Sequence, residues 1–189
     1  MNLTAEQLMG LFVHRKDVFS TQQKNGAYFP TKRPITVEDI EKHIAGDTTI
    51  GVYCLEIDNT VKWACVDLDG DKDKTPAENR RMLYPEANIV FNTFHDFPRM
   101  LEFSGRKGFH IWVFFEPRVT ADYAQRLVKA RLNRVGLNRH EVFPKQTELN
   151  ESRLYGNLVK LPMAVHKKTG LRSEIIKMEG LELVGSVTP

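Results

Sequence analysis

The sequence has few cysteines and no long apolar run, and both absences narrow the class of protein. Only two of the 189 residues are cysteines, Cys54 and Cys65, and they lack CxxC spacing. This disfavours a disulfide framework and a cysteine-based zinc site, so we expect a reducing, cytoplasmic location. No apolar stretch approaches the ~20 residues that cross a bilayer, and the first residues do not resemble a signal peptide. We therefore expect no membrane partner.

Repeats, low-complexity linkers and clustered histidines are also missing. Apolar residues make up 41% of the chain and charged residues 27%, which is typical of one soluble domain. The net charge of +3 is mild but uneven, because residues 117–189 contain 13 Lys and Arg against 7 Asp and Glu, and residues 1–116 contain 14 against 17. A basic half beside an acidic centre suits a polyanionic substrate, although a solvated helix face with a basic tail explains the charge equally well.

Capping patterns and apolar periodicity predict an α+β domain with a mostly antiparallel sheet. Helices are expected over 4–13, 37–45, 75–84 and 121–135, and strands over 50–55, 61–68, 99–103, 109–115, 140–143, 157–161 and 173–177. We expect residues 14–35 to form an ordered loop. Pro85 is expected to end the third helix, and the first two strands are expected to form a hairpin.

Two aspartates, Asp67 and Asp69, lie at the end of an apolar strand. Alternate residues of a strand share a face, so the two carboxylates should lie about 6–7 Å apart along it. That spacing suits hard divalent cations, and without metal the like charges should raise at least one pKa. A strand end that runs into a polar turn explains the same residues without any metal.

A small basic turn, from Ser104 to Gly108, lies between two apolar strands. Its glycines let the backbone approach a ligand closely, and Arg106 and Lys107 add positive charge. His110 follows on the strand and can donate to a phosphate oxygen. The alternative is an ordinary hairpin turn with a surface histidine.

In chain order, these segments resemble the motif series of the archaeo-eukaryotic primase superfamily. Asp67-Leu68-Asp69 is similar to its first motif, and Ser104 to Trp112 is similar to its second. Phe143-Pro144-Lys145-Gln146 and Gly156 to Pro162 resemble small primase-polymerases of CRISPR-associated, plasmid and conflict-system type. The resemblance spans roughly residues 11–172.

The resemblance implies a fold and a chain organisation. An RRM-like antiparallel catalytic sheet with flanking helices is expected over 61–189, with a smaller N-terminal α/β element over 1–60. Family members often continue into a helical priming domain, whereas this sequence ends at Pro189. We therefore expect either the catalytic part of a longer protein or a small member of the family.

The resemblance also assigns roles to residues. Asp67, Asp69 and Glu141 are expected to be catalytic and to hold two divalent ions, Mn²⁺ or Mg²⁺, and no zinc is expected. The residues expected to bind the nucleotide are Ser104, Arg106, Gly108, His110, Lys160 and His166. Those expected to contact nucleic acid are Lys145, Lys167 and Lys168. Tyr28 or Trp112 could stack on a base.

The implied activity is template-directed nucleotidyl transfer to a 3′-hydroxyl, with primer initiation left open. The expected partners are a DNA template-primer and dNTP or NTP, and we expect a monomer. Two alternatives remain, a non-catalytic RRM-like module that binds single-stranded nucleic acid and a two-metal nuclease. The first predicts aromatic residues on the sheet face, where this chain has acids.

Overall fold

The computed structural model describes residues 2–152, 154–167 and 169–182. Four helices are assigned in that part of the chain: α1 (Ala5–Phe12), α2 (Val37–Ala45), α3 (Pro76–Thr93) and α4 (Ala121–Arg134). The strands are β1 (Phe19–Gln22), β2 (Tyr28–Thr31), β3 (Ile50–Tyr53), β4 (Thr60–Leu68), β5 (Arg99–Phe103), β6 (Phe109–Thr120), β7 (Glu141–Phe143), β8 (Leu158–Lys160) and β9 (Glu174–Glu179). None of the helices in this part combines the length and apolar content that crossing a membrane requires.

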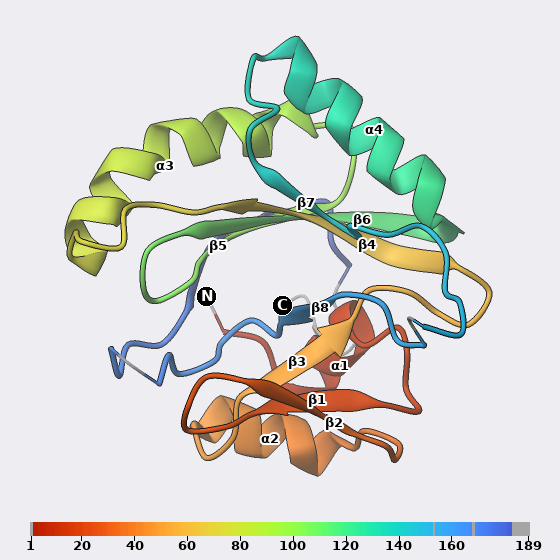
Figure 1. Cartoon of the computed structure of the whole chain (residues 1–189). Coiled ribbons are helices and arrows are strands. Elements are labelled where there is room, and N and C mark those ends of the chain that lie inside the picture. The colour runs from red at the N-terminus through yellow and green to blue at the C-terminus, as the bar shows by residue number, and fades with distance from the viewer. Residues whose placement is uncertain (1, 153, 168, 183–189) are drawn as a thin grey trace, which may run out of the picture.

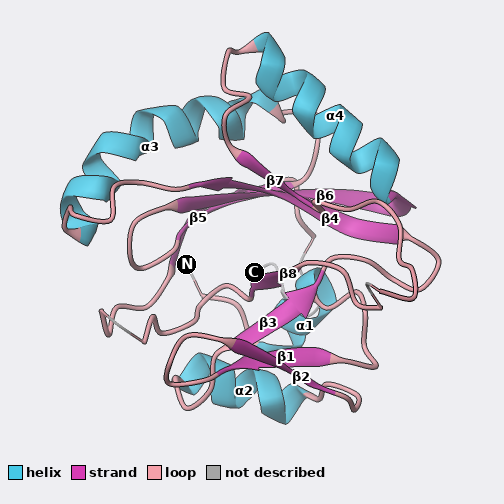
Figure 2. Ribbon diagram, in the orientation of Figure 1, coloured by secondary structure: helices cyan, strands magenta, loops and turns pink. Residues whose placement is uncertain are grey.

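The strands form two antiparallel sheets, which confirms the α+β prediction. The larger sheet has the order β7-β4-β6-β5-β9, and the smaller has the order β2-β1-β3-β8. Figure 1 shows α3 and α4 on one face of the larger sheet and the smaller sheet on its other side, with α2 outermost. Figure 2 shows the same layers by secondary structure. Strand β8 comes from late in the chain, yet it completes the sheet of the N-terminal portion.

Both faces of the larger sheet are covered by apolar packing. On one face Phe109 contacts Tyr84 of α3, with 6.1 Å between the ring centroids. On the other face Trp112 packs edge-on against Phe12 of α1 at 4.9 Å, and Trp63 is fully buried beside it. The polar residues at the end of β4 therefore lie where this second apolar layer stops.

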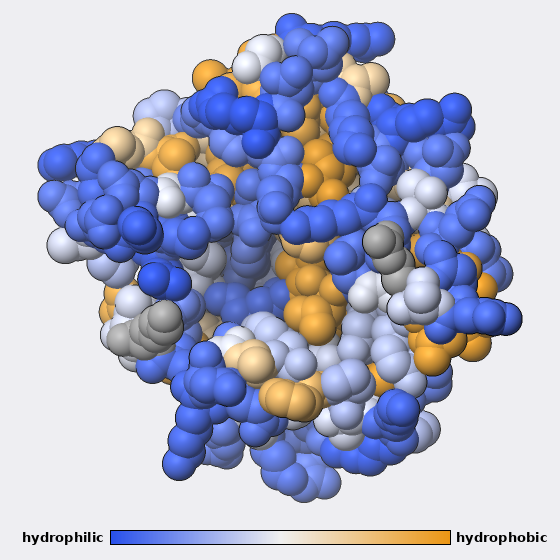
Figure 3. All heavy atoms as spheres, in the orientation of Figure 1, coloured by the Kyte–Doolittle hydropathy of each residue, from blue (hydrophilic) through white to orange (hydrophobic). Residues whose placement is uncertain are grey.

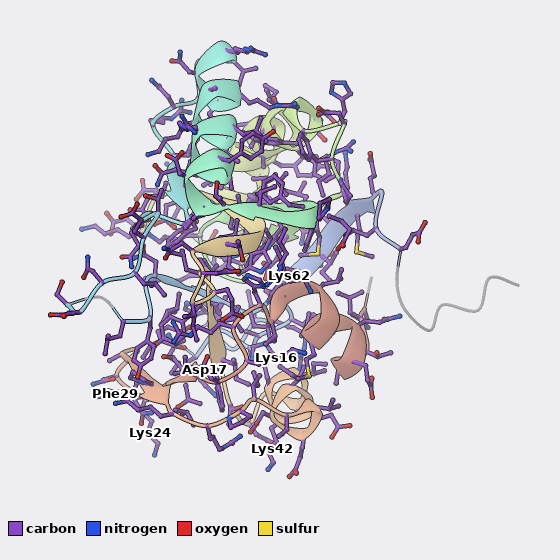
Figure 4. All side chains as sticks on the ribbon, turned by 90° about the vertical axis from the view of Figure 1, so that its right-hand side faces the viewer. Lys16, Asp17, Lys24, Phe29, Lys42 and Lys62 are labelled. Carbon is purple, nitrogen blue, oxygen red and sulfur yellow. The ribbon has the colours of Figure 1, made fainter. Side chains whose placement is uncertain are left out.

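The region 14–35, expected to be a loop, contains the β1–β2 hairpin. The strands pair from Phe19 opposite Thr31 to Gln22 opposite Tyr28, and Gly26 supplies the turn with φ +90°. Each strand has only four residues, which is too short for a visible two-residue apolar pattern. In Figure 4 the labelled Lys24 and Phe29 mark this hairpin at the edge of the molecule.

Helix α3 continues past Pro85 to Thr93, so the prediction that it ends near Tyr84 was wrong. The proline lies inside the helix, where it removes one backbone hydrogen bond at a cost of about 3 kcal/mol. Beyond it Ala87, Val90 and Phe91 are buried in the core. Burying a large apolar side chain contributes about 1.5–3 kcal/mol to folding. Together these buried residues outweigh the hydrogen bond that the proline removes.

The predicted hairpin between 50–55 and 61–68 was also wrong. The turn exists, with Glu56 N–H donating to Thr60 and Asn59 at φ 60°, but the strands separate into different sheets. Strand β3 pairs with β1 and β8, and β4 pairs with β6 and β7. The chain crosses here from the smaller sheet to the larger one.

Candidate active site

Four polar residues form a row across the larger sheet. Asp67 on β4 lies directly opposite His110 on β6 and, on its other side, opposite Glu141 on β7. His110 in turn lies opposite Glu102 on β5. Residues opposite each other in antiparallel strands share a face with Cβ atoms about 5 Å apart, so all four side chains project to the same side. The register thus brings together two of the predicted acids and the predicted histidine.

Asp67 lies at the centre of this row in an environment that disfavours its charge. Its side chain is 23% exposed. Burial raises the pKa of Asp67, His110 opposes that shift, and the charges of Asp69 and Glu141 add to it. The sequence predicted a raised carboxyl pKa from like-charge repulsion; the pKa of Asp67 is raised, with burial as the larger cause and the like charges as smaller ones. A cation at this position would relieve the repulsion.

The other two acids are held by lysines. Lys107 Nζ lies 2.6 Å from the Asp69 carboxylate, and Lys145 Nζ lies 2.8 Å from that of Glu141. Within residues 2–152, 154–167 and 169–182, no three acidic, histidine or cysteine side chains converge as ligands of one ion. The donor chemistry of the three carboxylates fits Mg²⁺ or Mn²⁺. Asp69 and Glu141 would have to leave their lysines to bind an ion with Asp67.

Two glycines let the end of β4 lie directly against the Ser104–Gly108 turn. A β-carbon on Gly108 would overlap the Leu68 carbonyl oxygen and lie 3.3 Å from the Asp69 carboxylate. A β-carbon on Gly70 would overlap both the Asn79 side chain and the Lys107 carbonyl oxygen. Close backbone contact therefore fixes where Asp69 sits, and this is a positional role for Gly108.

The turn itself is closed by Ser104. Its backbone N–H donates to the Gly108 carbonyl at 2.9 Å, and its hydroxyl accepts from the Gly108 N–H at 3.2 Å. Lys160 on β8 donates from Nζ to the Ser104 carbonyl at 2.9 Å, which links the smaller sheet to this turn. Burial lowers the pKa of Lys160, while the charges of Glu102 and Asp67 oppose that shift.

Glu102 is a residue of this row that the sequence reasoning missed. It is fully buried on β5, and it accepts hydrogen bonds from His110 Nδ1 at 3.0 Å and from Trp112 Nε1 at 3.1 Å. In the sequence it is one of two charged residues, with Arg99, in an otherwise apolar strand. The sequence did contain one signal for it: side chains alternate between the two faces of a strand, so Glu102 lies on the same face as Ser104, two residues further along.

A cavity of about 280 Å³ lies over the row, between the two sheets. Figure 3 shows a hollow in the middle of this face, with hydrophilic residues on its left side and hydrophobic ones on its right, and Phe143, Leu158 and Val159 contribute apolar lining to the cavity. The cavity is lined by the predicted residues Asp67, Asp69, Ser104, Arg106, His110, Lys160 and His166, and also by Gln22, Tyr28 and Lys107. Acids therefore lie close to a group of basic residues, as a metal-assisted phosphate site requires.

The remaining predicted residues lie near this cavity, except for one that falls outside the residues that the structure describes. Lys145 lines a neighbouring cavity of about 510 Å³, and Lys167 lines another of about 290 Å³ beside Arg106 and His166. Lys168 falls outside the described residues. Trp112 has no exposed surface, so the suggestion that it stacks on a base was wrong. Tyr28 borders the site cavity, and its stacking role stays a prediction.

Two solved structures share this fold at low sequence identity. The polymerase domain of Mycobacterium tuberculosis ligase D, in complex with DNA, matches with a TM-score of 0.55 and 15% identity over 88% of this chain and 74% of that one. The archaeo-eukaryotic primase domain of the cyanophage S-2L primase-polymerase matches with a TM-score of 0.59 and 13% identity over 95% of this chain and 91% of that one. A search of curated protein sequences gives no match.

A family description extends the comparison to the sequence. Residues 4–183 match the family described as "TOTE conflict system, Archaeo-Eukaryotic Primase domain". Of the three contexts that the sequence suggested, this match supports the conflict-system type and not the CRISPR-associated one. The match spans nearly the whole chain, and the chain therefore belongs to the archaeo-eukaryotic primase domain family of TOTE conflict systems.

Proposed function

We propose that the protein is a template-directed nucleotidyltransferase of the primase-polymerase type. The observation that carries this proposal is the position of Asp67, in direct register between Glu141 and His110 beneath a cavity lined by basic residues. Carboxylates that gather divalent ions beside a polycationic pocket are suited to a nucleoside triphosphate. Family membership supports the same reaction class.

In the proposed reaction a 3′-hydroxyl attacks the α-phosphate of the bound nucleotide in line, and pyrophosphate leaves. Divalent ions held by Asp67, Asp69 and Glu141 would lower the pKa of the hydroxyl and neutralise phosphate charge. Arg106, His110 and Lys160, with Ser104 and His166 beside them, bind and orient the triphosphate. Such positioning and electrostatic stabilisation supply most of the rate in phosphoryl transfer.

The proposed macromolecular partner is a DNA primer-template. Lys145 and Lys167 line two further cavities, where they could contact strand phosphates. We extend this role to Lys168 from its sequence position alone. The ligase D polymerase domain, which shares the fold, was solved with DNA. Lys145 now pairs with Glu141, so metal binding to Glu141 would free it for a phosphate.

The burial of the sheet aromatics argues against a non-catalytic RRM-like module. Such modules stack bases on aromatic side chains that are exposed on the sheet. Here Trp63 and Trp112 are fully buried beneath α1, and the exposed part of the same face has acids. Acids repel a nucleic-acid backbone unless metal intervenes, which favours the nucleotidyl-transfer proposal.

A labelled primer-template incubated with dNTPs tests this function. We expect lengthening with Mn²⁺ or Mg²⁺, none with EDTA, and none with the Asp67→Asn, Asp69→Asn double variant. The same reaction with an unlabelled template and labelled nucleotide, without primer, tests initiation. Shortening of the primer would identify a nuclease instead, and an unchanged primer under every metal condition would refute the proposal.

A further inference from the structure

Glu102 is a buried carboxylate whose position needs a reason beyond packing. It has no exposed surface and lies within the larger sheet, where an apolar side chain of similar size would be easier to accommodate. One of its oxygens, Oε2, accepts from both His110 Nδ1 and Trp112 Nε1. The other, Oε1, has no hydrogen-bond partner among the residues that the structure describes, and Ser173 lies near this carboxylate.

The contact with Glu102 fixes the orientation of the His110 ring. An ionised carboxylate can only accept hydrogen bonds, so the ring nitrogen that faces it must be the one that has a hydrogen. The ring also stands edge-on to Trp112, at 87° and 5.9 Å between centroids. With Nδ1 held in this way, Nε2 faces the site, 3.7 Å from the Asp67 carboxylate.

The charges around His110 are consistent with a cationic ring. A histidine that donates from Nδ1 to Glu102 and from Nε2 to a phosphate has both hydrogens and is positively charged. The facing groups are Glu102 and Asp67, which favour that charge, and Lys160, which opposes it. Glu102 Oε2 lies 3.0 Å from Nδ1, closer to the ring than the Asp67 carboxylate, which lies 3.7 Å from Nε2. Glu102 is therefore the nearer acidic partner of the ring.

We propose that Glu102 is a positioning residue for nucleotide binding, which holds His110 so that Nε2 points at the triphosphate. The inference rests on the proposed function, because it assumes that His110 contacts the nucleotide. Glu102 is too deeply buried to touch that ligand itself. It acts through one hydrogen bond and one charge, as the outer partner of the row Glu141, Asp67 and His110.

The test compares binding by the full chain and its variants. The probes are dATP with Mn²⁺ and, separately, a single-stranded oligonucleotide. Glu102→Gln keeps an oxygen that can accept from Nδ1 but removes the negative charge, so it should weaken dATP binding about tenfold or more and leave oligonucleotide binding unchanged. Glu179→Gln makes the same chemical change on β9, where its partner is Arg99, and should change neither affinity.

A double-variant comparison separates positioning from general structural support. If Glu102 acts through His110, adding Glu102→Gln to His110→Ala should weaken dATP binding no further. Effects that add in full would overturn the proposal. So would unchanged dATP affinity in Glu102→Gln.

The ring nitrogens provide a readout that needs neither a variant nor activity. In ¹⁵N-labelled wild-type protein, with the His110 signals assigned by their loss in His110→Ala, Nδ1 should be protonated. An unprotonated Nδ1 would overturn the proposal even if Glu102→Gln failed to fold. If the wild type bound no dATP with Mn²⁺, the proposed function would fail, whereas the state of Nδ1 would still decide whether Glu102 holds the ring.

Discussion

Gly108→Ala is a one-methyl change that should separate site geometry from overall folding. A β-carbon on Gly108 would lie inside the 3.0 Å limit that such contacts respect, against the backbone carbonyl of Leu68. Backbone cannot rotate away as a side chain can, so the turn and the end of β4 must move apart. The same β-carbon would also press on the carboxylate of Asp69.

The size of the effect follows from this overlap. The added β-carbon would lie 2.4 Å from the Leu68 oxygen, and an ordinary contact begins at 3.4 Å. The two groups must therefore move apart by about 1 Å, and misplacement of that order lowers rates about a hundredfold in catalytic sites. Overpacking of this kind costs about 1–3 kcal/mol of folding free energy. We therefore expect Gly108→Ala to remain folded at 25 °C, with a somewhat lower Tm and a large loss of primer extension.

Gly10→Ala is the matched control. Gly10 lies inside α1 with nothing within 4 Å of an added β-carbon, and its carbonyl accepts from Lys62, which Figure 4 labels beside this helix. The change should stabilise the helix by up to about 1 kcal/mol and leave extension intact. Steady-state extension rates and thermal melts measure both quantities. If Gly108→Ala extended primers at the wild-type rate, the close approach of the turn to β4 would not position the acids.

Two further predictions concern charge. Asp67→Asn should leave the Tm unchanged or raise it, because a carboxylate with a raised pKa destabilises the fold when it is ionised. The same variant should bind Mn²⁺ more weakly, as followed by electron paramagnetic resonance. A clear fall in Tm would contradict this reasoning. His43 accepts from the Ile50 N–H and donates to the Pro162 carbonyl, both at 2.9 Å, and burial lowers the pKa of His43 to about 4. The unfolded value is about 6.5, so the stability from neutral His43 is complete above pH 6.5 and is lost as the pH falls towards 4, by up to about 3 kcal/mol. Urea unfolding at pH 7.5 and 4.5 should show this loss in the wild type and much less in His43→Gln, whereas equal losses in both would assign the pH dependence to other groups.

Local signals in the sequence predicted local structure well. The helices expected from residues 4, 37 and 75 begin where the sequence predicted, at capping boxes of Thr4, Thr36 and Thr75, because a cap depends on residues only three apart. Strand pairing was less accessible. Every residue of β3 is buried, so no alternation distinguishes its faces and nothing in the sequence showed that β4 would leave it.

The candidate site shows the same limit. The positions of Asp67 and His110 followed from motif order, yet their direct opposition depends on the register of β4 against β6. Glu102 was missed because its importance comes from a neighbour across the sheet and not along the chain. The end of α3 was mispredicted at Pro85 for a related reason, since the contacts that keep this helix intact are with residues distant in the sequence.

The contribution of β8 to the smaller sheet has a consequence for synthesis on the ribosome. Until Leu158–Lys160 has emerged, Gly51–Tyr53 lacks its second neighbour and leaves one row of backbone amides and carbonyls unpaired. Lys160 reaches the Ser104 turn only in the same late event. A nascent chain would thus hold an open sheet edge until Lys160 has emerged, and the cavity at the candidate site would be completed only then.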